Sequence, residues 1–515
     1  MKSVSNDSMH PQTVSELRQT FLSQLPAFLA RQRWFGGKAR QILGVDIMDA
    51  VPLGADEPKA MVLAVSVQYR EGPAEAYSIP VVSALQSGSL VDAFSRTEFL
   101  AELFEIIQQE REVPGENGRL QGFRGASFSE LCGSVKSATP KLLTGEQSNS
   151  SVIYGERLIL KFFRRVEAGE NPDLEIGRFL SDRAHFPHIA RIGGWLEYQP
   201  RHGESATQAI LQEFVPNQGD AWRYALKTLT AFYQRAGDAP KRVLSASQEP
   251  SEFGEESMAR LLAEIGLLGK RTAELHLALG SDSGDLAFAP EPFTKEFQDR
   301  LATSFAELTT GTLRLLRQRL ASVPIGYKER AEEIGAREQD IVRTFRSALS
   351  APIRATRTRI HGDYHLGQVL YTGTDFVIID FEGEPARPLA ERRIKQSPLQ
   401  DVAGILRSFH YVAFAPLLMP AVESSMTDQR FVRLSSWAET WSQCAKDRFL
   451  ARYYETSAAA HYLPAKSQEA DKLLEIYLLA KAVYELGYEL NNRPAWVGIP
   501  LKGIAPLLSS TKDKD

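Results

Sequence analysis

The most constraining feature of this chain is a short hairpin with polar residues on both sides of it. Two apolar runs, 369–371 and 376–379, flank a glycine-containing turn whose length is typical of a β-hairpin. Asp363 and Gln368 precede the first run, and Asp380 follows the second. We therefore expect these three polar side chains to lie close together.

The spacing of the three residues matches the protein-kinase signature. In that signature an Asp accepts the proton of the incoming hydroxyl, an Asn five residues later binds metal, and the Asp of a later Asp-Phe-Gly binds the second metal position. Here Asp363 precedes Gln368 by five residues, and Asp380 opens Asp-Phe-Glu. The pattern predicts Asp363 as the catalytic base, with Gln368 and Asp380 as Mg²⁺ ligands. The alternative is a plain His-Gly-Asp turn between two core strands.

Length and composition bound the class of protein. The 515 residues exceed the roughly 250–300 over which one core keeps growing, which predicts two or more domains. A net charge of -4 argues against a nucleic-acid partner. With two cysteines and no apolar run near the ~18 residues of a membrane span, we expect a protein of the reducing cytoplasm without a membrane segment.

The resemblance of the catalytic motif to the kinase signature implies an α+β fold of the protein-kinase-like, bilobal type, which the order of the expected elements fits. A small α+β cap subdomain is expected over 1–115 and a nucleotide-binding N-lobe over 116–216, followed by a large, mainly helical C-lobe over 217–515 that carries the catalytic loop. The elements expected in the cap are a helix over 14–29, strands over 45–51, 61–69 and 76–82, and a helix over 94–110.

Nucleotide contacts are expected in the N-lobe. Lys161 lies inside an apolar strand, where it either extends to solvent from an edge strand or pairs with nucleotide phosphates. Glu175, on the next helix, is its expected partner. A polar run resembles a phosphate-covering loop in which hydroxyls and amides replace glycines and backbone N–H groups could face phosphate: Gln147, Ser148, Asn149, Ser150 and Ser151.

The strand that ends at Pro216 is a candidate hinge between the lobes. Its last residues include Glu213 and Val215. If this strand lies at a sheet edge, their backbone groups are free to bind adenine. The alternative is a simple strand end.

Aromatic residues near the C-terminus are candidates for a sugar site. Tyr484, Tyr488 and Trp496 offer flat faces and polar tips, although tyrosines on an apolar helical stripe usually belong to the core. His365, beside the expected base, is a further substrate candidate. Asp401, together with Ser397, is expected to cap a helix start rather than to catalyse.

Taken together, several segments resemble the bacterial maltokinases, whose kinase-like fold is akin to that of aminoglycoside phosphotransferases. The resembling segments are Arg31-Gln-Arg-Trp-Phe-Gly-Gly-Lys38, Asn171-Pro-Asp-Leu-Glu175, Asn217-Gln-Gly-Asp220, His361-Gly-Asp-Tyr-His-Leu-Gly-Gln368, Asp380-Phe-Glu-Gly-Glu-Pro385 and Ser397-Pro-Leu-Gln-Asp-Val-Ala-Gly404. The resemblance implies ATP-dependent phosphorylation of maltose at its anomeric hydroxyl, giving maltose 1-phosphate for α-glucan (glycogen) synthesis. It implies Mg²⁺ on Gln368 and Asp380, phosphate contact by Lys161, and trehalose synthase as a separate partner protein.

Other acceptors and one other class of protein stay open. Related kinases act on other sugars, including glucosamine, and an antibiotic or small-amine kinase would want an acidic acceptor pocket. A pseudokinase-like module would bind nucleotide without transferring phosphate. The presence of Lys161, Asp363, Gln368 and Asp380 argues against such a module.

Overall fold

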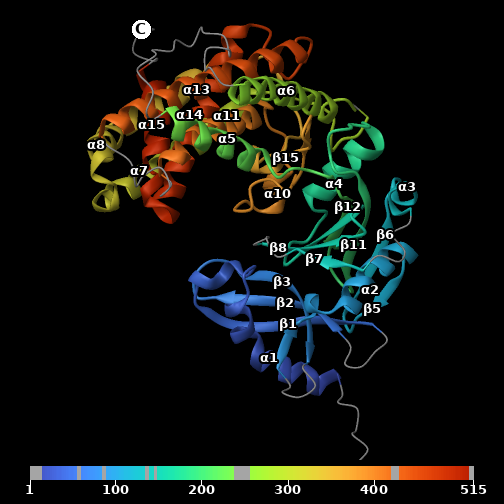
Figure 1. Ribbon diagram of the computed structural model, residues 1–515. Coiled ribbons are helices and arrows are strands. Elements are labelled where there is room, and N and C mark those ends of the chain that lie inside the picture. Colours follow the sequence, from blue (N-terminus) through green and yellow to red (C-terminus); the bar gives the residue numbers. More distant parts are fainter. Residues whose placement is uncertain are drawn as a thin grey trace, which may run out of the picture. The chain divides into compact units, whose positions relative to one another are not determined.

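The computed structural model describes residues 14–54, 60–83, 89–133, 139–143, 148–236, 256–282, 284–418 and 428–509 (Figure 1). The chain divides into two compact units. Unit 1 comprises Met1–Asp182 and Ala190–Val215, and unit 2 comprises Arg183–Ile189 and Pro216–Asp515.

Unit 1 begins with a helix packed on an antiparallel sheet, drawn in blue in Figure 1. The elements are α1 (Val14–Arg31), β1 (Ile42–Leu53), β2 (Ala60–Tyr69), β3 (Glu75–Ser83), β4 (Leu90–Asp92) and α2 (Thr97–Gln109). Apolar residues of α1, such as Phe21 and Leu25, cover one face of the sheet. The other face packs with α2 and the second sheet in a continuous core. Five elements predicted for the cap, a helix, three strands and a second helix, are therefore confirmed.

The second sheet of unit 1 has seven strands among the described residues, in the order β5-β6-β11-β12-β9-β8-β7. Its elements and flanking helices are β5 (Glu112–Pro114), β6 (Gly118–Arg124), α3 (Phe128–Cys132), β7 (Lys141–Leu142), β8 (Asn149–Tyr154), β9 (Leu158–Phe163), α4 (Pro172–Arg178), β11 (Ile192–Pro200) and β12 (Ala206–Glu213). Directly after β9, the two-residue strand β10 (Arg165–Val166) pairs with β3 of the first sheet. One stretch of chain thus belongs to both sheets.

Unit 2 is mainly helical and holds the predicted hairpin, β15 (Val369–Tyr371) and β16 (Phe376–Ile378). Its helices are α5 (Ala221–Ala236), α6 (Glu256–Leu279), α7 (Lys295–Gln318), α8 (Lys328–Ala336), α9 (Glu338–Ala348), α10 (Leu389–Arg392), α11 (Leu399–Phe414), α13 (Asp428–Thr456), α14 (Ser467–Asn492) and α15 (Gly498–Ser509), with a small pair β13 (Glu291–Pro292) and β14 (Thr356–Arg357). Helix α11 is buried along nearly its whole length and packs against α5, α13 and α14. It is the central helix of this unit.

Helices α8 and α9 follow each other directly. They are separated by a break at Arg337, whose ψ of 24° is not helical. Within the described residues, no helix combines the length and apolar character needed to cross a bilayer.

Candidate active site

The hairpin places Gln368 beside Asp380, as its spacing predicts. Gln368 ends a short 3₁₀ helix, η8 (Leu366–Gln368), immediately before β15. Its Nε2 donates to Asp380 Oδ2 at 2.7 Å, and its carbonyl accepts from the N–H of Ile379 at 3.0 Å. The antiparallel register brings the two ends of the hairpin together, because Val369 pairs with Ile378.

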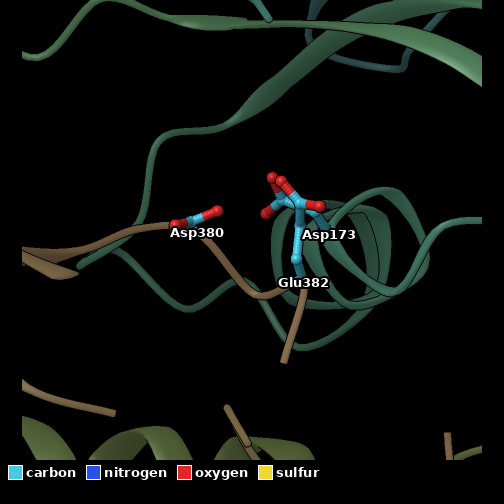
Figure 2. Close-up of side chains that lie close together, drawn as sticks. All are labelled: Asp173, Asp380 and Glu382. Carbon is cyan, nitrogen blue, oxygen red and sulfur yellow. The ribbon is translucent and has the colours of Figure 1, made fainter. Parts of the chain in front are cut away.

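A second carboxylate lies in the loop after β16. Figure 2 shows Asp380 and Glu382 on this loop, with Asp173 drawn on α4 of unit 1. Carboxylate oxygens of Asp380 and Glu382 lie within 4.8 Å of each other. Asp380 also has a φ of 68°, a left-handed conformation that costs a non-glycine residue about 1 kcal/mol or more. Two carboxylates and an amide suit a hard divalent cation such as Mg²⁺. Glu382 was missed, although it stands where the kinase motif has glycine.

The backbone around Asp363 is tied to the same loop. Gly362 has a φ of 85°, which glycine adopts without steric cost. His361 Nε2 lies 3.0 Å from the carbonyl of Ile379, so this nitrogen carries the proton, and Nδ1 is left to accept from the N–H of Asp363 at 3.4 Å. His361 therefore connects the segment of the expected base to the residue before Asp380.

The Asp363 carboxylate is partly accessible and lies near two nitrogens. Its side chain is 26% exposed. Lys481 Nζ, from α14, lies 3.7 Å from Oδ1, and His365 Nε2 lies 4.0 Å from Oδ2. The substrate role expected for His365 stays a prediction. Lys481 was missed because it lies 118 residues further along the chain than Asp363.

Asp401 binds the backbone of the loop that carries Asp363. The expectation that it caps a helix start was wrong. Its carboxylate accepts from the N–H groups of His361 at 2.7 Å and Gly362 at 2.9 Å, and lies 3.2 Å from His276 Nε2. Burial by itself raises the pKa of Asp401, but the hydrogen bond and charge of His276 and the bond from Gly362 lower it overall. Ser397 does accept from the N–H of Leu399 at 3.3 Å, as expected of a cap.

Helix α11 approaches this loop very closely. A Cβ at Gly404 would lie only 2.5 Å from the carbonyl oxygen of Tyr364. Glycine is therefore needed one turn after Asp401, so that the helix can bring the carboxylate to the loop backbone. This contact spans about 40 residues and leaves no periodic signal in the sequence.

A cavity of about 480 Å³ lies in unit 2. Its lining includes Tyr484 and Lys481 of α14, Arg300 of α7, and Glu384, Arg387 and Gln400. Lys481 belongs both to this lining and to the surroundings of Asp363. The cavity has the size and the mixed polar and aromatic lining of a small-ligand pocket.

The three aromatic candidates separate. Tyr484 lines the cavity and hydrogen-bonds to Glu384. Tyr488 is 47% exposed, and Trp496 stacks against Tyr411 with ring centroids 6.4 Å apart. The residues described as lining the cavity include neither Tyr488 nor Trp496. Although Tyr488 lies four residues after Tyr484 on the same helix, its side chain is exposed to solvent.

In unit 1, Lys161 lies in the sheet interior. Strand β9 pairs with β8 on one side and β12 on the other, so the edge-strand alternative is wrong. The Lys161 side chain is 13% exposed, and its Nζ donates to Asp173 Oδ2 at 3.0 Å. Asp173 was missed; it follows the helix N-cap Asn171, whose side chain accepts from the N–H of Asp173. Glu175 lies buried on the same helix, and its pairing with Lys161 stays a prediction.

The polar run before Lys161 is strand rather than loop from residue 149 onward. Ser151 is directly opposite Lys161 in the β8–β9 ladder, so Ser151 and Asn149 share the Lys161 face. Ser150 points to the other face, where its Oγ accepts from Arg164 Nε at 2.9 Å. The Ser150 side chain thus lies on the face opposite Lys161, and a phosphate contact by Ser150 stays a prediction. Ser148 is exposed, and Gln147 lies outside the described residues.

The expectation that the strand ending near Glu213 and Val215 lies at a sheet edge is also wrong. Strand β12 lies between β11 and β9 and is not an edge strand. The N–H of Glu213 donates to the carbonyl of Arg191 at 2.9 Å, and its carboxylate accepts from Arg191 Nε at 2.8 Å. An adenine contact here cannot use the N–H of Glu213, and a role for Val215 stays a prediction.

This chain is similar to known proteins over part or most of its length. Residues 28–92 match the model of the maltokinase N-terminal cap domain. A glucosamine kinase of Streptacidiphilus jiangxiensis is 25% identical over 371 residues, 70% of this chain and 72% of that protein. A glucosamine kinase of Mycolicibacterium smegmatis (strain ATCC 700084 / mc(2)155) is 24% identical over 374 residues, 71% of this chain and 79% of that protein.

The solved structures extend the likeness over almost the whole chain. A glucosamine kinase in complex with glucosamine, ADP and inorganic phosphate superposes with a TM-score of 0.62 at 20% identity, covering 95% of this chain and 99% of the other. A second crystal form of glucosamine kinase gives a TM-score of 0.59 at 21% identity, covering 96% and 99%. The predicted kinase-like α+β bilobal fold is therefore confirmed. The chain thus resembles the maltokinases in its residues 28–92 and shares the fold of glucosamine kinase.

Proposed function

We propose that this chain is an ATP-dependent kinase that phosphorylates a sugar hydroxyl. The observation that carries the proposal is the position of Asp363. Its accessible carboxylate lies 3.7 Å from Lys481, which also lines a cavity of about 480 Å³. A hydroxyl of a sugar held in this cavity would have a carboxylate within reach to accept its proton.

The chemistry follows from the side chains that this chain supplies. As the sugar oxygen bonds to the γ-phosphorus and the bond to the β-phosphate oxygen breaks, the hydroxyl proton passes to Asp363 and ADP leaves. Lys481 lies beside this carboxylate, with its Nζ 3.7 Å from Oδ1. Lys161 would bind phosphate oxygens. Mg²⁺ held by Gln368, Asp380 and Glu382 would neutralise charge on the transferred group.

The first candidate for the acceptor is maltose, phosphorylated at its anomeric hydroxyl to give maltose 1-phosphate for α-glucan synthesis in the cytoplasm. Its support is the match of residues 28–92 to the maltokinase cap. The second is glucosamine, since the relatives with matching folds are glucosamine kinases. Trehalose synthase as a separate partner follows only if maltose is the acceptor.

The test is ADP release from ATP and Mg²⁺ with a panel that includes maltose, glucose and glucosamine. We expect one sugar to raise ADP formation well above the background, and Asp363→Asn to lower kcat by ~10³-fold with ATP binding nearly unchanged. Asp447→Asn, at an exposed position on α13, is the matched control and should retain full activity. ATP binding without sugar-dependent ADP would instead indicate a nucleotide-binding module and contradict the proposal.

A further inference from the structure

The charges around the cavity bear on which sugar it accepts. Among the described residues that line it, Glu384 is the one carboxylate, while Arg300, Arg387 and Lys481 are cationic. A pocket for an amine-bearing acceptor needs a carboxylate free to pair with the ammonium group. The lining therefore carries more positive than negative side chains, and positive charge repels an ammonium group.

Glu384 is not free to serve as that partner. Arg387 Nε lies 2.8 Å from Glu384 Oε2, and Tyr484 hydrogen-bonds to the same carboxylate. The guanidinium of Arg387 therefore already balances the charge of this carboxylate.

Lys481 adds a like charge near the reacting end of the pocket. Its side chain is 32% exposed and its Nζ lies 3.7 Å from the carboxylate of Asp363. A sugar hydroxyl that reaches Asp363 lies close to this ammonium as well. An ammonium group of the sugar near Lys481 would be repelled by it, because solvent screening is incomplete at a partly buried site.

We propose that Arg387 and Lys481 make this pocket select an uncharged sugar over an amino sugar. The inference rests on the proposed function, since it concerns the acceptor of that same reaction. Arg387 acts by pairing with the carboxylate of Glu384, which is then not available to an amine. Lys481 acts by repelling the ammonium group of the sugar. Maltose and glucose satisfy the selection, and protonated glucosamine does not.

The experiment compares glucose with glucosamine, which differ at C2 by a hydroxyl and an ammonium group. We expect kcat/KM for glucose to exceed that for glucosamine by at least tenfold at pH 6.5. The ratio should narrow at pH 9, where the free amine is largely neutral. In Arg387→Gln the released Glu384 carboxylate becomes available, and glucosamine should gain at least tenfold relative to glucose.

Arg343→Gln is the matched control, because Arg343 is exposed on α9 and lies outside the cavity lining. Its glucose-to-glucosamine ratio should equal that of the wild type. A wild-type preference for glucosamine at pH 6.5, or an unchanged ratio in Arg387→Gln, overturns the inference. If no sugar is phosphorylated, the proposed function fails separately, and calorimetric binding that is tighter for glucosamine than for glucose then overturns the charge selection.

Discussion

The catalytic loop of unit 2 and the Lys161 strand of unit 1 are specified in different ways. Between His361 and Glu382 the polar residues contact one another across at most 18 sequence positions, for instance His361 with Ile379. In the second region, Lys161 is bound by Asp173 of helix α4, and the nearby Arg164 is bound by Asp92 of the first sheet. Motif spacing therefore predicted the first region well, and it misplaced several residues of the second.

Arg164 shows how the cap reaches the Lys161 strand. It lies between β9 and β10, where the chain passes from one sheet to the other, and its side chain is only 1% exposed. Two hydrogen bonds of 3.1 and 2.8 Å join it to Asp92, and its guanidinium lies 4.8 Å from the ring of Trp34. Trp34, in the segment 31–38 that resembles the maltokinases, thus packs against the residue that follows β9.

The largest effect that would test this comparison is expected at Asp401. In Asp401→Asn the amide cannot reproduce the ionised acceptor for the N–H groups of His361 and Gly362. We expect kcat to fall ~100-fold, as for a displaced catalytic group, and the free energy of unfolding to fall by about 3 kcal/mol. Activity assays and denaturant unfolding measure the two, with Asp447→Asn as control.

A pH series separates an ionic role of Asp401 from a merely steric one. Because the folded-state pKa of Asp401 is lowered, its contribution to stability is complete above its unfolded pKa of about 3.9 and is lost as pH falls through the folded value. The stability gap between wild type and Asp401→Asn should therefore narrow below pH 4. A gap that stays constant down to pH 2 would argue for shape rather than charge.

The next effect sharpens the choice of partner for Lys161. Asp173 binds Lys161 Nζ at 3.0 Å and is only 1% exposed. We expect Asp173→Asn to raise the KM for ATP by ~10-fold, through loss of a buried charge-assisted bond. Glu175→Gln is the matched comparison. A larger effect at Glu175 would restore the original expectation and assign Asp173 to helix structure.

A smaller effect on activity is expected at Arg164. Arg164→Met keeps much of the apolar contact with Trp34 and Phe94 but removes the two bonds to Asp92. We expect a loss of about 2 kcal/mol in unfolding free energy and a rise of ~3-fold in KM for ATP, since β9 is less firmly held. Thermal unfolding and ATP titration check this. An unchanged KM alongside lost stability would separate the cap from nucleotide binding.

The smallest effect is expected at Tyr488. Its ring is 47% exposed and lies outside the cavity lining. Tyr488→Ala should change kcat and KM for the sugar by less than ~2-fold, as for other surface substitutions. Tyr484→Ala is the contrast, because that side chain lines the cavity, and its sugar KM should rise clearly above that of Tyr488→Ala.

The sequence by itself determined the element order, the hairpin and the pairing of Gln368 with Asp380. These depend on periodicity and on short spacings along the chain, which residue types report directly. Tertiary structure decided that Asp401 supports the loop, that Asp173 binds Lys161, that Ser150 turns away and that Lys481 reaches Asp363. Each of these contacts depends on strand order, facing or helix approach, which no local pattern encodes, whereas Gln368 and Asp380 meet because a single hairpin joins them.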